Sequence, residues 1–385
     1  MKVGYLNKIS PLGLNLFTNK YSITEDFLNA DLLLVRSANM HEHPINDNLL
    51  AIARAGAGVN NIPLDKMAEK GIVVFNTPGA NANGVKELVI AGMLMTARDL
   101  IGGIDWVRNN KNDQDILKTI EKAKAAFGGT EIMGKTILVV GLGAIGGKVA
   151  NACSDLGMKV IGFDPYISEE AKSLLNDGIE INNNLSESYP IADYISLHLP
   201  LLDSTKHMIN AQAFQQMKKG TVLLNFSRDL LVKDEDLKDA LDQQIVKKYV
   251  TDFPDHFVAN LDNIIAFPHL GASTEESEDN CAIMACKQLM AYVEKGEIIN
   301  SVNYPNIKLE NITTKSRLII LAKNDPSLAR EIEKIMMDLE EFIKGKVSKV
   351  KGNYGYFAYD IDIVINPDTI EKLNALTGVT KVRVI

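Results

Sequence analysis

The sequence predicts an α/β protein with two doubly wound parallel-sheet lobes and a small α+β module after them. The first observation is a block of apolar runs that alternate with helical patterns over roughly the first 100 residues. The second is another block of the same alternation, which begins at Lys135. The third is a β-α-β-β-α-β pattern over roughly the last 70 residues. Two alternating blocks imply two lobes with a cleft between them.

The first block predicts buried strands, because short continuous apolar runs are typical of parallel strands covered on both faces. Its strand candidates are KVGYL, DLLLV, LLAIA and GIVVF. A single helical segment is expected next over residues 85–110, and it contains Trp106, the only tryptophan.

The second block has the strand candidates TILVV, KVIGF, DYISL, TVLLN, KKYVT and IIAF. A helix is expected from Thr274, which can cap it, with Glu275 and Glu276 favoured by the helix dipole. The polar stretch NSVNYPNIKLENITTKS then predicts a linker before the C-terminal module.

Composition excludes several classes of protein. The net charge of -8 argues against a nucleic-acid-binding protein, which would present a basic face. Cys153, Cys281 and Cys286 form no Cys-x-x-Cys pair, which indicates reduced thiols in the cytoplasm. We find no signal-peptide pattern and no apolar run long enough for a membrane span, so no membrane partner is expected.

The strongest motif is ILVVGLGAIGGKVANACSDLGMKVIGFDPY. It places Gly141, Gly143 and Gly146 after a strand and before a helix, as a dinucleotide-binding Rossmann lobe requires. The helix N-terminus then offers N–H groups to the pyrophosphate. Asp164 ends the next strand, where its carboxylate would accept from ribose hydroxyls and repel a 2′-phosphate. The motif therefore predicts NAD rather than NADP as the cofactor.

Further segments resemble the D-isomer-specific 2-hydroxyacid dehydrogenases over essentially the whole chain. They include AIARAGAGVNNIPLDKMAEKGIVVFNTPGANANGVKELVIAGML, ADYISLHLPLLDSTKHMI, MKKGTVLLNFSRDLLVKDEDL and IIAFPHLGASTEES. The resemblance implies a Rossmann lobe (residues 91–282) inserted in a flavodoxin-like substrate lobe (1–90 and 283–305). A linker (306–316) and an ACT-like regulatory or oligomerisation domain (317–385) are expected to follow.

The family uses an Arg, a Glu and a His in catalysis, and the resemblance places Arg228 and His269 in two of these roles. An Arg can hold the substrate's carboxylate or 2-oxygen with its fork of donors, and a His can give or take the proton. The family's Glu position falls on Phe257, and Asp229 replaces a Gly. We expect Asp255 to take the role of the Glu, with a His269 that works alone as the other interpretation.

The resemblance also implies the binding residues. The expected cofactor-binding residues are Gly141, Gly143, Ala144, Ile145, Gly146, Asp164, His198, Pro200, Asn225, Phe226, Ser227, Asp252, Gly271 and Ala272. The expected substrate-binding residues are Arg36, Arg54, Ala57, Gly58, Val59 and Asn81. An Ala-Gly-Val turn can bind a carboxylate through its backbone N–H groups. His41 and His43 lack the further ligands of a metal site, so no metal is expected.

The likeness is closest to family members that oxidise 3-phospho-D-glycerate with NAD, the first step of serine biosynthesis. ACT domains commonly carry a Pro-Gly pair in the effector loop, but Ser327 follows Pro326 here. The module therefore resembles an oligomerisation domain as much as a serine-binding one, and a homodimer or homotetramer is expected. The alternatives are a dehydrogenase for another D-2-hydroxy acid and, because of Phe257, an NAD-binding regulatory protein with weakened catalysis.

Overall fold

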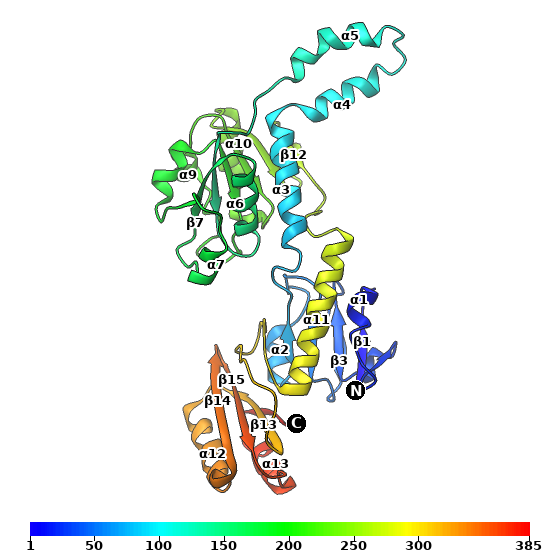
Figure 1. Cartoon of the computed structure of the whole chain (residues 1–385), viewed down its shortest axis with the longest axis vertical. Helices are drawn as coiled ribbons and strands as arrows, with labels where there is room; N and C mark the ends of the chain where they lie inside the picture. Colours follow the sequence, from blue (N-terminus) through cyan, green and yellow to red (C-terminus); the bar gives the residue numbers. More distant parts are fainter. The chain divides into compact units, whose positions relative to one another are not determined.

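A computed structural model describes all 385 residues, and its internal contacts divide the chain into two compact units. The first unit joins Met1–Ala80 with Glu278–Ile385, and the second unit is Asn81–Ser277. These divisions differ from the boundaries expected near residues 90 and 282, because the whole of helix α3 (Ala82–Ala97) packs in the second unit. Figure 1 labels several of the helices and strands of each unit.

A five-stranded parallel sheet in the order β2-β1-β3-β4-β5 forms the centre of the first unit, and this is the flavodoxin-like order that we predicted. Its strands are β1 (Lys2–Tyr5), β2 (Ser22–Thr24), β3 (Leu32–Val35), β4 (Ala51–Arg54) and β5 (Val73–Phe75). The connecting helices are α1 (Pro11–Leu14), η1 (Phe27–Asn29) and α2 (Leu64–Glu69). Strands β3 and β5 are buried along their whole length, which explains their continuous apolar sequences.

The long helix α11 (Glu275–Lys295) runs along the sheet of the first unit (Figure 1). Ala282, Ala285 and Leu289 lie on its buried face and share a core with Leu32 and Leu34. The spacing of three and four residues places these side chains on one face of the helix. This packing fixes α11 on the sheet in which β3 and β4 precede the predicted substrate residues.

A seven-stranded parallel sheet in the order β12-β11-β10-β9-β6-β7-β8 forms the second unit. Its strands are β6 (Thr136–Val140), β7 (Lys159–Phe163), β8 (Glu180–Ile181), β9 (Tyr194–Leu197), β10 (Thr221–Asn225), β11 (Val246–Thr251) and β12 (Ile264–Ala266). The helices around it are α6 (Gly146–Asp155), α7 (Glu169–Ser173), α8 (Leu185–Ser188), η3 (Tyr189–Ile191), α9 (Ala211–Gln216), η4 (Asp229–Leu231), α10 (Asp234–Asp242) and η5 (Val258–Asn260). The order reverses between β6 and β9, and ligands of doubly wound sheets bind at the carboxyl ends beside that point.

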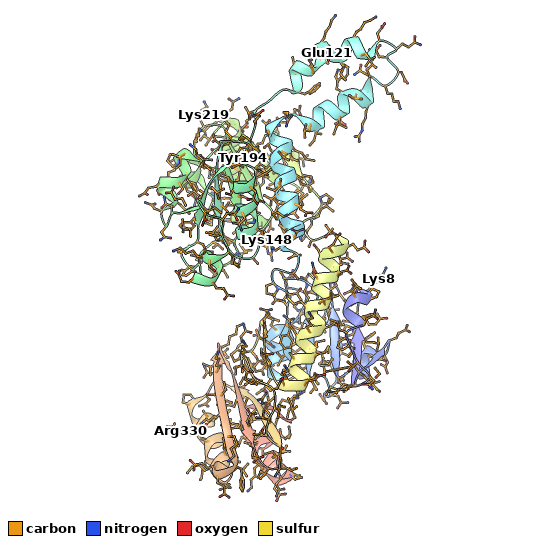
Figure 2. The ribbon with its side chains drawn as sticks, in the orientation of Figure 1. Lys8, Glu121, Lys148, Tyr194, Lys219 and Arg330 are labelled. Carbon is orange, nitrogen blue, oxygen red and sulfur yellow. The ribbon has the colours of Figure 1, made fainter.

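The single helix expected over residues 85–110 is wrong, because the structure divides it into α3 and α4 (Leu100–Asn109). Arg98 adopts extended backbone, and the Asp99 side chain accepts from the N–H of Gly102 to begin α4. With α5 (Ile116–Ala123) and η2 (Lys124–Phe127), α4 forms a hairpin that projects from the rest of the second unit in Figure 1. Glu121 lies on its surface, whereas Tyr194 lies inside the unit on β9 (Figure 2).

The C-terminal segment has the predicted β-α-β-β-α-β order and forms a four-stranded antiparallel sheet, β14-β15-β13-β16. Its elements are β13 (Ser316–Lys323), α12 (Pro326–Met337), η6 (Glu340–Phe342), β14 (Ile343–Lys351), β15 (Tyr354–Ile361), α13 (Pro367–Asn374) and β16 (Val379–Val384). Ile319 and Tyr356 join the same core as Phe75 and Tyr292. The Tyr356 hydroxyl donates to the carbonyl of Gly296 at 2.5 Å, so this module packs directly on the end of α11.

The three cysteines are buried and form no disulfide. None of the helices combines the length and apolar character that crossing a membrane requires.

Candidate active site

The glycine-rich turn lies at the point where the sheet order of the second unit reverses. Gly141 directly follows β6 with φ +92°, and a Cβ there would come within 2.5 Å of the His198 carbonyl oxygen. A Cβ on Gly146 would overlap the carbonyl oxygen of Gly141. No atom lies within 4 Å of the Cβ position at Gly143, and Ala144 is also exposed. The turn therefore needs glycine at two positions and leaves its backbone open to a ligand at the third.

Asp164 connects the end of β7 to this turn. Its carboxylate accepts from the N–H of Leu142 at 3.0 Å and from the N–H of Tyr166 at 2.9 Å. Ile145 is half-buried and packs against the core on the other side of the turn. Asp164 thus fixes the conformation of the turn as well as offering its carboxylate to a ribose.

His198 and Pro200 follow β9 on the other side of the reversal point. The Ser196 hydroxyl lies 2.8 Å from Nε2 of His198, and the buried Nδ1 has no hydrogen-bond partner. The Pro200 carbonyl accepts from the Thr205 hydroxyl at 2.7 Å, which fixes the loop. Burial lowers the pKa of His198 to about 3, so the ring is neutral and positions neighbouring groups rather than acting as a base.

We expect acid to destabilise the protein through His198. An unfolded His has a pKa of about 6.5, whereas the pKa of His198 in the folded protein is about 3. Between these values the unfolded chain binds a proton that the folded chain excludes, which lowers the free energy of unfolding by up to about 1.4 kcal/mol per pH unit. Above the pKa of the unfolded His, the contribution of His198 to stability is fully present. Urea unfolding measures the free energy of unfolding at pH 7 and at pH 4.5. The decrease between these pH values should be smaller for His198→Asn than for the wild type. Equal decreases would show that His198 is not the cause.

Arg228 follows β10 on a segment held by three hydrogen bonds. The Asn225 side-chain amide donates to the Arg228 carbonyl at 2.8 Å, and the Ser227 hydroxyl donates to the Leu197 carbonyl at 2.7 Å. The Arg228 guanidinium donates to the carbonyl of Ser227 at 2.5 Å and remains exposed. Phe226 is buried in the core, so its backbone rather than its ring is available to a cofactor.

Asp252 follows β11 and is almost fully buried. One carboxylate oxygen accepts from the N–H of Gly271 at 3.0 Å, and the other is buried without a partner. Burial raises the pKa of Asp252, and the nearby charges of His269 and Arg228 oppose that shift. Asp252 is thus the carboxylate that lies within electrostatic range of both predicted catalytic residues. Ala272 continues the same segment and is half-buried.

His269 lies two residues before Gly271 with φ +48°. Its backbone N–H donates to the carbonyl of Asp252 at 3.1 Å, while the exposed imidazole makes no hydrogen bond. The ring packs against Phe253, with 4.5 Å between ring centroids. Sequence reasoning missed Phe253, and its position directly after Asp252 was the only signal.

The expected pairing of Asp255 with His269 does not appear in this structure. The Asp255 carboxylate accepts from the N–H of Val258 at 2.7 Å, which begins the turn η5. Phe257, at the family's Glu position, is 40% exposed. The carboxylate is therefore used for capping, and the imidazole is held by an aromatic contact.

The predicted substrate residues of the first unit lie after β3 and β4. The Arg54 Nε donates to the Arg36 carbonyl at 3.0 Å, and the Arg54 guanidinium covers Gly56, where a Cβ would collide with it. The backbone N–H groups of Ala57, Gly58 and Val59 donate to no protein acceptor. This turn is therefore an open set of donors for an anion.

Two further residues complete this description. Glu278 of α11 forms an ion pair with Arg36, with 2.6 Å between Oε1 and Nη2, and no feature of the sequence indicated that pair. Asn81 belongs to the second unit, precedes α3 and has a buried side-chain oxygen without a partner. No group of three His, Cys, Asp or Glu side chains in the chain is arranged to hold a metal ion.

The residues of the second unit fit a dinucleotide. The open glycine turn at the N-terminus of α6 suits a pyrophosphate, and the Asp164 carboxylate suits a ribose. The buried Asp252 Oδ1 has no hydrogen-bond partner, and an acceptor of this kind suits the amide N–H groups of a nicotinamide.

Comparison with known proteins agrees with this geometry. Residues 90–271 match the family described as D-isomer specific 2-hydroxyacid dehydrogenase, NAD binding domain. D-3-phosphoglycerate dehydrogenase of Methanocaldococcus jannaschii is 32% identical over 343 residues, which are 86% of this chain and 63% of that protein. This chain therefore spans less than two thirds of that relative's length.

Two other comparisons define the range of relatives. Hydroxypyruvate reductase of Thermotoga maritima is 36% identical over 269 residues, which are 66% of this chain and 81% of that protein. The NAD⁺-bound 3-phosphoglycerate dehydrogenase of Entamoeba histolytica shares the fold with a TM-score of 0.60 and 24% identity, over 79% of this chain and 98% of that one.

Proposed function

The chain belongs to the D-isomer-specific 2-hydroxyacid dehydrogenase family, and we propose that it oxidises 3-phospho-D-glycerate to 3-phosphohydroxypyruvate with NAD. The observation that carries the chemistry is that Arg228, Asp252 and His269 follow β10, β11 and β12 at the carboxyl-end edge of the parallel sheet in which β6 precedes the glycine turn. The substrate is supported by the phosphoglycerate dehydrogenase relative and by the arginines of the first unit. The reaction would begin serine biosynthesis.

Each residue of the group has a distinct task in the proposed reaction. When bound, NAD accepts the hydride that leaves C2 of the hydroxy acid. Arg228 offers its guanidinium to the substrate's carboxylate or 2-oxygen, and Asn225 and Ser227 fix the segment that carries it. His269 takes the hydroxyl proton as the carbonyl forms, and returns a proton in the reverse direction. Asp252 stabilises the positive charges of both residues from the buried side.

The substrate assignment is tested by NADH consumption with a panel of 2-keto acids. We expect the highest kcat/KM with 3-phosphohydroxypyruvate, followed by hydroxypyruvate, glyoxylate and pyruvate. Arg36→Ala should raise KM for the phosphorylated acid by about 10–100-fold, because charged hydrogen bonds contribute about 1.5–3 kcal/mol. Arg330→Ala removes an exposed charge from α12 of the C-terminal module (Figure 2) and is the matched control.

A second candidate is the reduction of an unphosphorylated keto acid. The hydroxypyruvate reductase relative favours it, as does the ion pair that already occupies Arg36. Faster reduction of hydroxypyruvate than of 3-phosphohydroxypyruvate by the wild-type protein would select this candidate.

We expect NADH to bind at least about tenfold more tightly than NADPH, a difference of about 1.4 kcal/mol. The Asp164 carboxylate at the end of β7 would repel a 2′-phosphate. Fluorescence titration with each cofactor measures the ratio of dissociation constants. Asp164→Ser should bring the two dissociation constants closer together. Because Asp164 also accepts from the N–H of Leu142, a melting curve verifies that the variant is folded. Equal affinities in the wild type would contradict the assignment.

We expect serine below 1 mM to leave the activity unchanged within about 20%. The loop before α12 borders a hollow of about 430 Å³ lined by Asn324, Asp325 and Thr377 among others. The Asp325 carboxylate already accepts from the N–H and hydroxyl of Ser327 at 2.8 Å, so it caps α12 and would repel an incoming carboxylate. Initial rates with and without serine test this, and inhibition at sub-millimolar serine would show that the module is an effector domain.

We also propose a cytoplasmic homo-oligomer. The α4–α5 hairpin exposes Leu100, Ile104 and Val107 at spacings of four and three residues, and Leu117 beyond them. Such an apolar row favours burial against another chain, and light scattering after gel filtration measures the assembly.

A further inference from the structure

The first unit contains an ion pair at the position where the substrate's anion is expected. Arg36 follows β3, and its Nη2 lies 2.6 Å from Oε1 of Glu278 in the first turn of α11. Both side chains are accessible, with 39% of the Arg36 and 45% of the Glu278 side chain exposed. A dissolved anion can therefore reach the guanidinium and compete with the carboxylate.

The backbone on both sides of the pair is fixed. The Asn7 side-chain oxygen accepts from the N–H groups of Arg36, Ser37 and Ala38 at 2.9 to 3.0 Å. On the helix side, Asp279 accepts a hydrogen bond from the Ser10 hydroxyl, which anchors the first turn of α11. Because both supports are held, opening the pair requires only rotation of two side chains.

A buried thiol and a second arginine lie near the pair. Cys281 lies one turn further along α11 and is buried within electrostatic range of Arg36, Arg54 and Glu278. Asp279 accepts a hydrogen bond from the Ser10 hydroxyl. The Arg54 guanidinium lies against Gly56, directly before the turn whose N–H groups at residues 57–59 are open to an anionic ligand.

We propose that Glu278 is an internal competitor for Arg36, and that a phosphoryl group must displace its carboxylate to bind. This proposal rests on the proposed function, since it assigns Arg36 to the phosphoryl end of the substrate. Glu278 then acts as a specificity-determining residue. It weakens the binding of every ligand whose anion needs Arg36, and it leaves ligands that lack such a group unaffected.

The size of the effect follows from the exposure of the pair. Accessible ion pairs contribute about 0–1 kcal/mol, so displacing Glu278 should weaken binding by up to about fivefold. Glu278→Gln should therefore lower KM for 3-phosphohydroxypyruvate by about two- to fivefold and change kcat by less than about twofold. The KM for pyruvate or glyoxylate should remain within about twofold of wild type. Glu278→Asp keeps the charge and should lie nearer to wild type than Glu278→Gln does.

The decisive experiment uses inorganic phosphate as a competitive inhibitor of keto-acid reduction at constant ionic strength. Its inhibition constant should fall by the same two- to fivefold, that is by about 0.4–1 kcal/mol, in Glu278→Gln. Glu276→Gln removes the same charge from an exposed residue of the same helical turn and is the control. In an Arg36→Ala background, Glu278→Gln should have no effect, because the shared partner is gone. Melting curves verify that each variant is folded.

The outcomes separate this inference from the proposed function. If 3-phosphohydroxypyruvate is reduced but neither its KM nor phosphate inhibition responds to Glu278→Gln, the competitor role is wrong. An equal response to Glu276→Gln would also overturn it, because the effect would then follow net charge. If 3-phosphohydroxypyruvate is a poor substrate, the proposed function fails, and phosphate inhibition of whichever keto acid is reduced still decides the role of Glu278.

Discussion

Replacing His269 by Gln should lower kcat for keto-acid reduction by about 10²–10⁴-fold, because Gln cannot carry the proton that the 2-oxygen needs. His269 is an exposed histidine whose backbone N–H donates to the carbonyl of the buried Asp252, and Asp252 lies in electrostatic range of it. Stopped-flow or steady-state NADH consumption measures kcat. The dissociation constant for NADH should stay within about threefold, since cofactor binding does not require a proton donor.

Two comparisons make this result specific. His256→Gln changes an exposed histidine of the neighbouring loop and should have no measurable effect on kcat. Asp255→Asn should lower kcat by less than about threefold, because the Asp255 side chain caps Val258 and an Asn can do the same. A loss as large as that of His269→Gln would instead restore Asp255 as the carboxylate partner. A loss below tenfold in His269→Gln would remove that residue from the chemistry.

Ten of the twelve strands of the two parallel sheets could be predicted because their signal is local, whereas the short strands β2 and β8 were not expected. Four-residue apolar runs such as Leu32–Val35 and residues 137–140 are buried, and parallel strands covered on both faces give that pattern. The glycine turn was predicted for a related reason. Gly141 and Gly146 are required by close approaches of the backbone within one short segment, so their spacing alone carries the information.

The break between α3 and α4 could not be read from periodicity. Apolar residues continue on both sides of Arg98, and the turn depends on whether Asp99 caps a new helix or continues the old one. The same composition supports either outcome, and packing of α3 against the second sheet decides it. The hidden signal was the Asp-Leu-Ile-Gly order, in which Asp99 can accept from the N–H of Gly102.

Contacts between distant segments explain what the sequence left undetermined in the site. Arg36 and Glu278 meet because α11 returns to a sheet formed near the start of the chain, and no spacing rule connects them. His269 packs on Phe253 instead of a carboxylate because the loop after β11 turns at Asp255 to begin η5. The C-terminal module likewise joins the core of the first unit through Ile319 and Tyr356. The local sequence pattern does not predict this contact, because the segments that it joins are distant in the chain.

Replacing Arg228 by Lys should lower kcat/KM for the keto acid by about 10²–10³-fold, although the charge is retained. A guanidinium can donate to the substrate's carboxylate or 2-oxygen while keeping its bond to the Ser227 carbonyl. A Lys ammonium is a single point of charge without the planar fork, so it cannot make both contacts in the same geometry. The backbone of this segment should not move, because Asn225 and Ser227 hold it independently of the Arg228 side chain.

Arg228→Gln should lose at least as much kcat/KM as Arg228→Lys, because it removes the charge as well as the fork. Arg330→Lys makes the same Arg-to-Lys substitution at an exposed position of α12 and is the control. NADH titration and a melting curve should be unchanged in each variant, so that a lower kcat/KM reports on the substrate alone. If Arg228→Lys retained more than about a third of wild-type kcat/KM, the forked geometry would not be needed. The anion would then be held mainly by residues of the first unit.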